Sequence, residues 1–140
     1  MEGLYEDYEE EYNFTRAYIK NMYNFYGYGI WVVVRKEDDV IIGRAGLSNR
    51  EVDGETKLEL GYVIGEEYQN QGYAYEACKA VCEFAKEKLY EDELVCFIKK
   101  GNDSSVKLAE KLNFEFVMDI VYEGDEYGYY RLDLDSCKSG

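Results

Sequence analysis

The sequence predicts an α+β fold in which helices flank a mixed, mostly antiparallel sheet. Three observations predict it. One helical run comes first, followed by three strand-like runs separated by short turns. An amphipathic helix and a short apolar strand come next, and a second helix and a closing hairpin complete the order. Because the chain has 140 residues and no linker-like or repeated segment, we expect residues 1–140 to form a single domain.

The first helix is predicted over residues 13–24, where Phe14, Tyr18 and Met22 recur every four residues. The acidic, tyrosine-rich residues 1–12 before it show no clear strand pattern. Three strands are then predicted, which are rich in aliphatic residues and form an antiparallel meander. They cover residues 30–34, 40–47 and 58–64, with turns at 37–39 and 52–55.

A central helix is predicted over residues 72–89, because its small and apolar residues recur at spacings of three and four. The continuous apolar run at 94–98 predicts a strand that is buried on both faces. Since a helix connects them, the strands at 58–64 and 94–98 should be parallel. Residues 102–105 are a suitable cap for a second helix over 106–112. The closing hairpin is predicted at residues 114–121 and 127–134.

Charge and composition exclude several classes of function. The formal net charge is −14, from 16 basic and 30 acidic residues. This argues against nucleic-acid and anionic-membrane partners, which bind basic surfaces. It is compatible with a cationic acceptor, or with solubility alone. The chain has no histidine, so histidine-dependent triads and histidine-ligated metals are excluded.

Four cysteines are present. Cys78 and Cys82 lie four residues apart in the predicted central helix and are expected to be small core residues. Cys96 lies in the apolar strand, where a thiol stays protonated, and Cys137 lies near the end. No metal site is predicted from this spacing. Without a secretory leader or an apolar run of about 18 residues, the chain is expected to be cytoplasmic with reduced thiols.

The most informative segment is the turn Gln-Asn-Gln-Gly-Tyr-Ala at residues 69–74, just before the central helix. A helix start presents unpaired N–H groups and the positive end of the helix dipole, and both favour phosphate binding. Gly72 and Ala74 let a ligand approach the backbone, and Gln69 and Gln71 add neutral donors. The turn has neither the Lys-Ser/Thr pair of a P-loop nor the three glycines of a dinucleotide fingerprint. We therefore expect a phosphate-bearing small molecule here.

Gly61 lies within the third predicted strand, where a glycine weakens packing. One interpretation is a bulge that splays this strand away from residues 94–98 and frees backbone groups to pair with an extended ligand. The other interpretation is an incidental glycine, and the residues leave both open.

Two motifs, together with the helix between them, resemble the GNAT superfamily of N-acetyltransferases. The first is Glu-Leu-Gly-Tyr-Val-Ile at 59–64 followed by Gln-x-x-Gly-x-Ala at 69–74. The second is Asn-x-x-Ser-x-x-Leu-x-Glu-Lys-Leu-x-Phe at 102–114. The resemblance covers residues 30–134 and looks strongest to the branch that acetylates ribosomal-protein N-termini. It implies the acyl-CoA N-acyltransferase fold, acetyl-CoA as cosubstrate, and a first strand that is missing or replaced by the acidic N-terminus.

By this resemblance, the two motifs bind acetyl-CoA. The strand backbone would pair with the pantetheine arm, the turn would hold the pyrophosphate, and the second helix would bond the pantetheine from the other side. Lys107 and Lys111 either face the nucleotide phosphates or form a solvated helix face. The residues implied for cofactor binding are Tyr62, Val63, Ile64, Gln69, Asn70, Gln71, Gly72, Tyr73, Ala74, Asn102 and Ser105.

Acetyl transfer needs a base, because an alkylammonium has a pKa of about 10. Glu59 is the candidate general base by the resemblance, or it is only a polar residue on a solvated strand face. Many family members carry a tyrosine acid where this chain has Ala109. The leaving thiolate would then depend on water or on another tyrosine, such as Tyr127, Tyr129 or Tyr130.

Two further positions depart from the family pattern. Gln69 stands where arginine is frequent, which weakens the Coulomb attraction for phosphates. Asn113 stands where glycine is usual, and asparagine tolerates the left-handed conformation that a helix end needs. The acceptor site is expected at the N-terminal helix and the closing hairpin. Its tyrosines, including Tyr18, and the acidic residues 6–11 would suit a cationic amine, or they are core and rim residues.

The sequence therefore predicts an N-acetyltransferase that transfers an acetyl group from acetyl-CoA to a primary amine. The acceptor would be a small molecule or a peptide N-terminus, attacking directly in a ternary complex. Two alternatives stay open: a non-catalytic acyl-CoA-binding or sensing module of the same fold, and an interaction domain without a cofactor. The sequence does not predict an oligomeric state.

Overall fold

The computed structural model of the chain describes residues 11–13, 17–25, 28–87 and 90–134. Its elements are β1 (Glu11–Asn13), β2 (Ala17–Phe25), β3 (Tyr28–Arg35), β4 (Val40–Val52), β5 (Glu55–Ile64), the 3-10 turn η1 (Glu66–Tyr68), α1 (Tyr73–Glu87), β6 (Glu93–Lys99), α2 (Asp103–Lys111), β7 (Glu115–Tyr122) and β8 (Asp125–Asp133).

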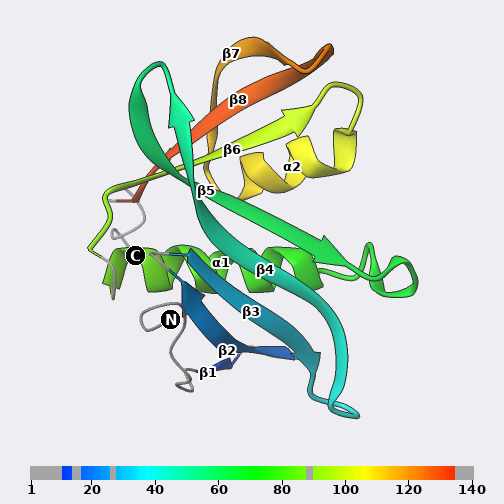
Figure 1. Ribbon diagram of the computed structural model, residues 1–140. Coiled ribbons are helices and arrows are strands. Elements are labelled where there is room, and N and C mark those ends of the chain that lie inside the picture. The colour runs from blue at the N-terminus through cyan, green and yellow to red at the C-terminus, as the bar shows by residue number, and fades with distance from the viewer. Residues whose placement is uncertain (1–10, 14–16, 26–27, 88–89, 135–140) are drawn as a thin grey trace.

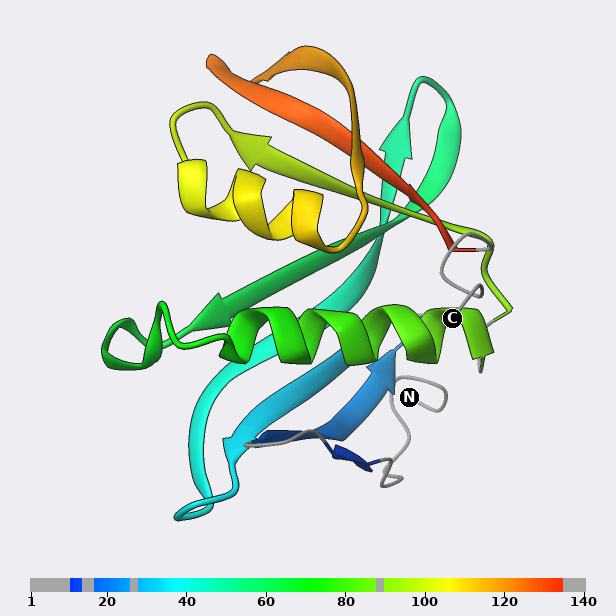
Figure 2. The same ribbon diagram turned by 180° about the vertical axis from the view of Figure 1, so that it is seen from behind.

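In this described part, the strands form one sheet in the order β1-β2-β3-β4-β5-β6-β8-β7 (Figure 1). Neighbouring strands are antiparallel except for β5 and β6, which are parallel as predicted. Helices α1 and α2 lie on the same side of the sheet, the side nearer the viewer in Figure 2. The predicted α+β fold with a mixed, mostly antiparallel sheet is therefore confirmed.

The helix predicted at residues 13–24 is wrong. This segment instead contributes the end of β1 and most of β2, which pairs with β3. Ala17 and Ile19 alternate into the core and have no exposed surface. A register shift between Asn21 and Tyr23 interrupts the two-residue period, which hides the strand in the sequence. The sheet thus extends past β3, at the place where the resemblance implied a missing or replaced strand.

The core lies between α1 and the sheet. The Trp31 ring of β3 meets the Phe84 ring of α1 edge-on, with 4.9 Å between the ring centroids. Cys78 and Cys82 are buried in the same core, as predicted from their spacing on the helix. Within the described ranges, no helix has the length and apolar character needed to cross a membrane.

Local turn and cap chemistry agrees with the sequence. Asp53 and Gly54 join β4 to β5 with positive φ angles of 50° and 82°, which suit a two-residue hairpin turn. The Asn102 side chain accepts a hydrogen bond from the Ser105 backbone N–H and caps α2. Asn113 has a φ of 76°, the left-handed conformation expected of it after this helix.

Candidate active site

The sheet is forked between β5 and β6. Glu59 pairs with Val95, and beyond this single pair the two strands diverge (Figure 2). Strand β5 stays paired with β4 as far as Ile64 and shows no register shift. The bulge considered for Gly61 is therefore wrong. The strands splay because β5 and β6 pair only at Glu59 and Val95. Beyond this pair, one edge of the β5 backbone has no strand beside it.

The fork opens into a cavity of about 730 Å³ between β5, β6, α1 and α2. Its charged lining residues are Glu59, Lys99, Lys107 and Lys111. Three lysines against one glutamate make the cavity lining basic, although the whole chain has a net charge of −14 and Lys99 also pairs with Asp125 at 3.6 Å. Such a local field attracts an anionic ligand.

Ten of the twelve residues predicted for the site line this cavity. The exceptions are Gln71, in the turn before α1, and Tyr73, whose side chain is buried in the core. The turn and both motifs, which are far apart in the sequence, therefore meet around one space. The predicted residues that line it are Glu59, Tyr62, Val63, Ile64, Gln69, Asn70, Gly72, Ala74, Asn102 and Ser105.

The turn before α1 has the conformation that an anion site needs. Asn70 and Gly72 have positive φ angles of 63° and 90°. The Glu76 N–H donates to the Gly72 carbonyl at 3.1 Å, so the regular hydrogen bonds of α1 begin there. The N–H groups just before Glu76 have no acceptor within the helix, and they lie beside the cavity-lining residues Gly72 and Ala74.

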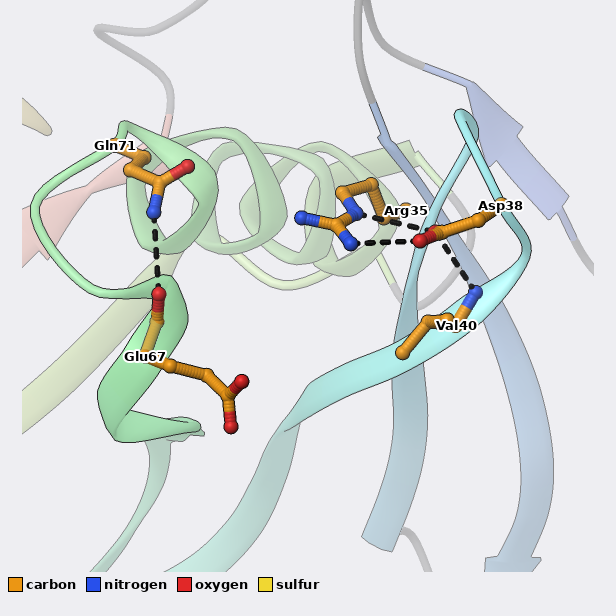
Figure 3. A network of polar contacts seen from close by, with 5 residues as sticks. All are labelled: Arg35, Asp38, Val40, Glu67 and Gln71. Atoms are coloured by element: carbon orange, nitrogen blue, oxygen red, sulfur yellow. Dashed lines mark hydrogen bonds and ion pairs between the residues drawn. The ribbon is translucent and has the colours of Figure 1, made fainter.

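The glutamine side chains of this turn support the loop itself. Gln69 Nε2 donates to the carbonyl of the last β5 residue at 3.0 Å, and Gln71 Nε2 donates to the Glu67 carbonyl at 3.3 Å (Figure 3). Figure 3 also shows Arg35 paired with Asp38 across from this loop, with 2.7 Å between the closest nitrogen and oxygen. The turn would therefore bind an anion mainly through its backbone N–H groups and not through side-chain charge.

The Glu59 carboxylate at the apex of the fork has a cationic partner. Arg50 Nε donates to Glu59 Oε1 at 2.9 Å. The guanidinium carbon of Arg50 lies 4.9 Å from the centroid of the Phe97 ring and 5.7 Å from that of Tyr122. Sequence reasoning missed Arg50. Pairing the residues of β4 and β5 outward from the Asp53–Gly54 turn would have placed Arg50 opposite Lys57 and diagonal to Glu59.

A pair of hydroxyl groups crosses the cavity wall between β5 and α2. Tyr62 Oη and Ser105 Oγ are 3.0 Å apart, and both residues line the cavity. Burial raises the pKa of the Tyr62 hydroxyl, so this hydroxyl stays protonated at neutral pH. Ala109, one turn after Ser105, is buried and carries no polar group.

The tyrosines proposed to replace a tyrosine at Ala109 lie elsewhere. Of the described residues that line the cavity, none is Tyr127, Tyr129 or Tyr130. The Tyr129 ring stacks on Phe97, with centroids 5.1 Å apart, and Tyr130 is buried. Compared with these three tyrosines, Tyr62 is better placed to donate a proton into the cavity, because it lines the cavity.

The expected acceptor site has no N-terminal helix in the described residues, because β1 and β2 lie there. Tyr18, which we expected at this site, donates to Asp39 Oδ1 at 3.4 Å, next to the turn between β3 and β4. The side chains of the acidic segment 6–11 and of Tyr23, Tyr26 and Tyr28 lie outside the described residues.

Cys96 lines the cavity, but its environment opposes a role as nucleophile. Burial, with the nearby Glu59 charge, raises the pKa of the Cys96 thiol to about 12, and burial raises that of Cys78 to about 12 as well. Both thiols are therefore protonated across the neutral range. Among the described residues, no cluster of Cys, Asp and Glu is arranged to hold a metal ion.

We expect iodoacetamide at pH 8 to alkylate Cys96 and Cys78 at least about 100-fold more slowly in the folded protein than in urea, because only the thiolate reacts. Mass spectrometry of the two cysteine-containing peptides over time measures both rates. Similar rates in the two states would contradict the protonated, buried thiols.

A sheet forked between two parallel strands, with a helix beginning on each side of the fork, is the architecture of the acyl-CoA N-acyltransferase fold. Sequence comparison then gives the family. The acetyltransferase (GNAT) domain model matches residues 4–115, and the chain belongs to this family.

Individual relatives are distant. The uncharacterized protein YkkB of Bacillus subtilis (strain 168) is 27% identical over 105 residues, which cover 73% of this chain and 61% of that protein. The chain therefore spans less than two thirds of the length of this relative.

Two solved structures share the fold. The putative acetyltransferase yncA of Salmonella typhimurium, solved with its cofactor acetyl-CoA, has a TM-score of 0.66 and 21% identity, covering 78% of this chain and 66% of that chain. The ribosomal-protein-S5-alanine acetyltransferase of Vibrio fischeri has a TM-score of 0.69 and 20% identity, covering 79% of this chain and 64% of that chain.

Proposed function

We propose that this chain transfers an acetyl group from acetyl-CoA to a primary amine of a small molecule or a peptide N-terminus, by direct attack in a ternary complex. The observation that carries the proposal is the fork. Beyond Glu59, β5 has a backbone edge without a β6 partner, and this edge faces a basic cavity of about 730 Å³. An extended, phosphate-bearing ligand fits both features.

The residues present suit acetyl-CoA. The backbone of Tyr62, Val63 and Ile64 would pair with the pantetheine arm, and the N–H groups of the turn at residues 69–74 would hold the pyrophosphate. Asn102 and Ser105 lie on the α2 side of the cavity. The Asn102 side-chain oxygen caps α2 and the Ser105 hydroxyl shares a hydrogen bond with Tyr62 Oη, so both residues are held in place at this wall. Bound acetyl-CoA supplies the acetyl group as a thioester.

Glu59 is proposed as the general base that accepts the proton of the amine, directly or through water. A backbone N–H near Val63 would donate to a carbonyl oxygen held in the fork. Tyr62 Oη and Ser105 Oγ carry two protons and share one hydrogen bond, so one proton remains to be donated into the cavity. We assign to this pair the stabilisation of negative charge that a tyrosine at position 109 would otherwise provide.

Two observations narrow the choice of acceptor: a similarity to a solved structure and the net charge of the chain. The similarity to a ribosomal-protein-S5-alanine acetyltransferase, together with the two motifs, favours a peptide N-terminus of a ribosomal protein. The negative charge of the chain favours a basic acceptor of this kind. We place the reaction in the cytoplasm, consistent with Cys78 and Cys96, which are free cysteines in the described part of the chain.

Thermal shift and turnover test the proposal together. Acetyl-CoA at about 100 times its Kd should stabilise the chain by about 2.7 kcal/mol, seen as a rise in Tm. Turnover is followed by release of free thiol with a panel of amines and peptides, including peptides that begin with alanine. A rise in Tm without thiol release across the panel would favour the sensing module. No rise in Tm would favour an interaction domain without a cofactor.

A further inference from the structure

Arg50 is held at the fork by three groups of two chemical kinds. Its Nε donates to the Glu59 carboxylate at 2.9 Å, and its guanidinium lies over the rings of Phe97 and Tyr122, at 4.9 and 5.7 Å from their centroids. The Phe97 ring is itself stacked on Tyr129. A carboxylate with two aromatic faces is a set of groups that binds alkylammonium and guanidinium ions. We call Glu59, Phe97 and Tyr122 the cation cage.

The cation cage adjoins the cavity. Glu59 and Phe97 both line the cavity at the apex of the fork. Leu58 and Leu60 on either side of Glu59 are buried in the core, so the Glu59 side chain points to the opposite face of the sheet, away from α1 and α2. The Glu59 side chain therefore lies on the face of the sheet seen in Figure 1, opposite the two helices.

Two other basic side chains on neighbouring strand positions form ion pairs with residues outside the cation cage. Lys57 Nζ pairs with Glu93 at 3.0 Å and with Glu55 at 3.2 Å, and Arg131 also pairs with Glu93. Among the ion pairs of the described residues, Arg50 is the one that neutralises Glu59. The Arg50 side chain is 37% exposed and that of Glu59 is 18% exposed, so a soluble cation can reach the pair and compete with Arg50 for the carboxylate.

We infer that the cation cage is a binding site for the ammonium or guanidinium group of the acceptor, and that Arg50 occupies it until the acceptor binds. This inference rests on the proposed acetyltransferase function for the identity of its ligand. It adds the acceptor subsite and a requirement on the acceptor: the positive group must compete with an internal arginine. Displacement of Arg50 also leaves Glu59 Oε1 facing the incoming N–H group.

Small cations test the cage without acetyl-CoA. Arg50→Ala should bind ethylguanidinium at least about tenfold more tightly than the unsubstituted chain in isothermal titration, because the internal competitor is gone. Adding Glu59→Gln to this variant should abolish the gain. Arg131→Ala is the matched control: it also removes an arginine from an ion pair with a glutamate, and it should bind no more tightly than the unsubstituted chain.

Each outcome decides the inference. Equal affinity of Arg50→Ala and the unsubstituted chain would overturn it, and so would a gain that survives Glu59→Gln. Arg50→Thr, which introduces a β-branched residue suited to strand β4, is scored by the same criteria in case the alanine variant fails to fold. Because no acetyl-CoA is present, failure here leaves the thermal-shift test of the proposed function intact, and failure of that test leaves the cage intact.

Discussion

Glu59→Gln is expected to lower kcat/KM for acetyl transfer by about 100-fold, the usual contribution of a positioned general base. The amide keeps the size of the side chain and can still contact Arg50, but it cannot take a proton from the amine. The loss should be largest at low pH, where nearly all of the acceptor is an ammonium ion. Initial rates of thiol release between pH 6 and 9 measure it, with the Kd of acetyl-CoA expected to change little.

Glu55→Gln is the control for this substitution. Glu55 is on the same strand and pairs with Lys57, but its side chain is 72% exposed and it is not a lining residue of the cavity. Its rate profile should match that of the unsubstituted chain. A Glu59→Gln variant with unchanged rates at every pH would remove Glu59 from the mechanism and support its interpretation as a solvated strand residue.

Gly72→Ala is expected to weaken acetyl-CoA binding about tenfold or more. Gly72 has a φ of 90°, where an L-residue costs about 1–2 kcal/mol. The turn would relax toward negative φ and move its N–H groups away from the anion. A loss of 1.4 kcal/mol of binding free energy corresponds to a tenfold change in Kd, which isothermal titration measures directly.

Gly54→Ala separates backbone strain from lost binding. Gly54 has a similar φ of 82° in the hairpin between β4 and β5, and an added Cβ there would meet nothing within 4 Å. This variant should lose comparable stability but keep its affinity for acetyl-CoA. If Gly72→Ala binds as tightly as Gly54→Ala does, the turn is not the pyrophosphate site.

Much of the fold follows from local signals in the sequence. The α1 stripe, the apolar β6 run, the Asn102 cap and the Asp53–Gly54 turn each determine their element through residues close in the chain. The N-terminal segment could not be predicted in this way. Its spacing of four favours a helix, whereas the buried pair Ala17 and Ile19 is stabilised by strands and a helix that come later in the chain.

The candidate site was predictable in part. The turn and the α2 cap lie at helix starts, so the residues that meet at the cavity were mostly visible in the two motifs. The surroundings of Glu59 could not be predicted from the two motifs. Arg50 reaches it through the register of a hairpin, and Tyr122 comes from β7, more than 60 residues away in the printed sequence.

The single pair of Glu59 and Val95 makes the sheet two half-sheets joined at one backbone position. On one side lie β1 to β5, and on the other lie β6, β8 and β7. An extended ligand in the fork would act as a short additional strand that completes the sheet. Binding would therefore add a second backbone connection between the two half-sheets, and amide hydrogen exchange along β5 and β6 should slow when the fork is filled.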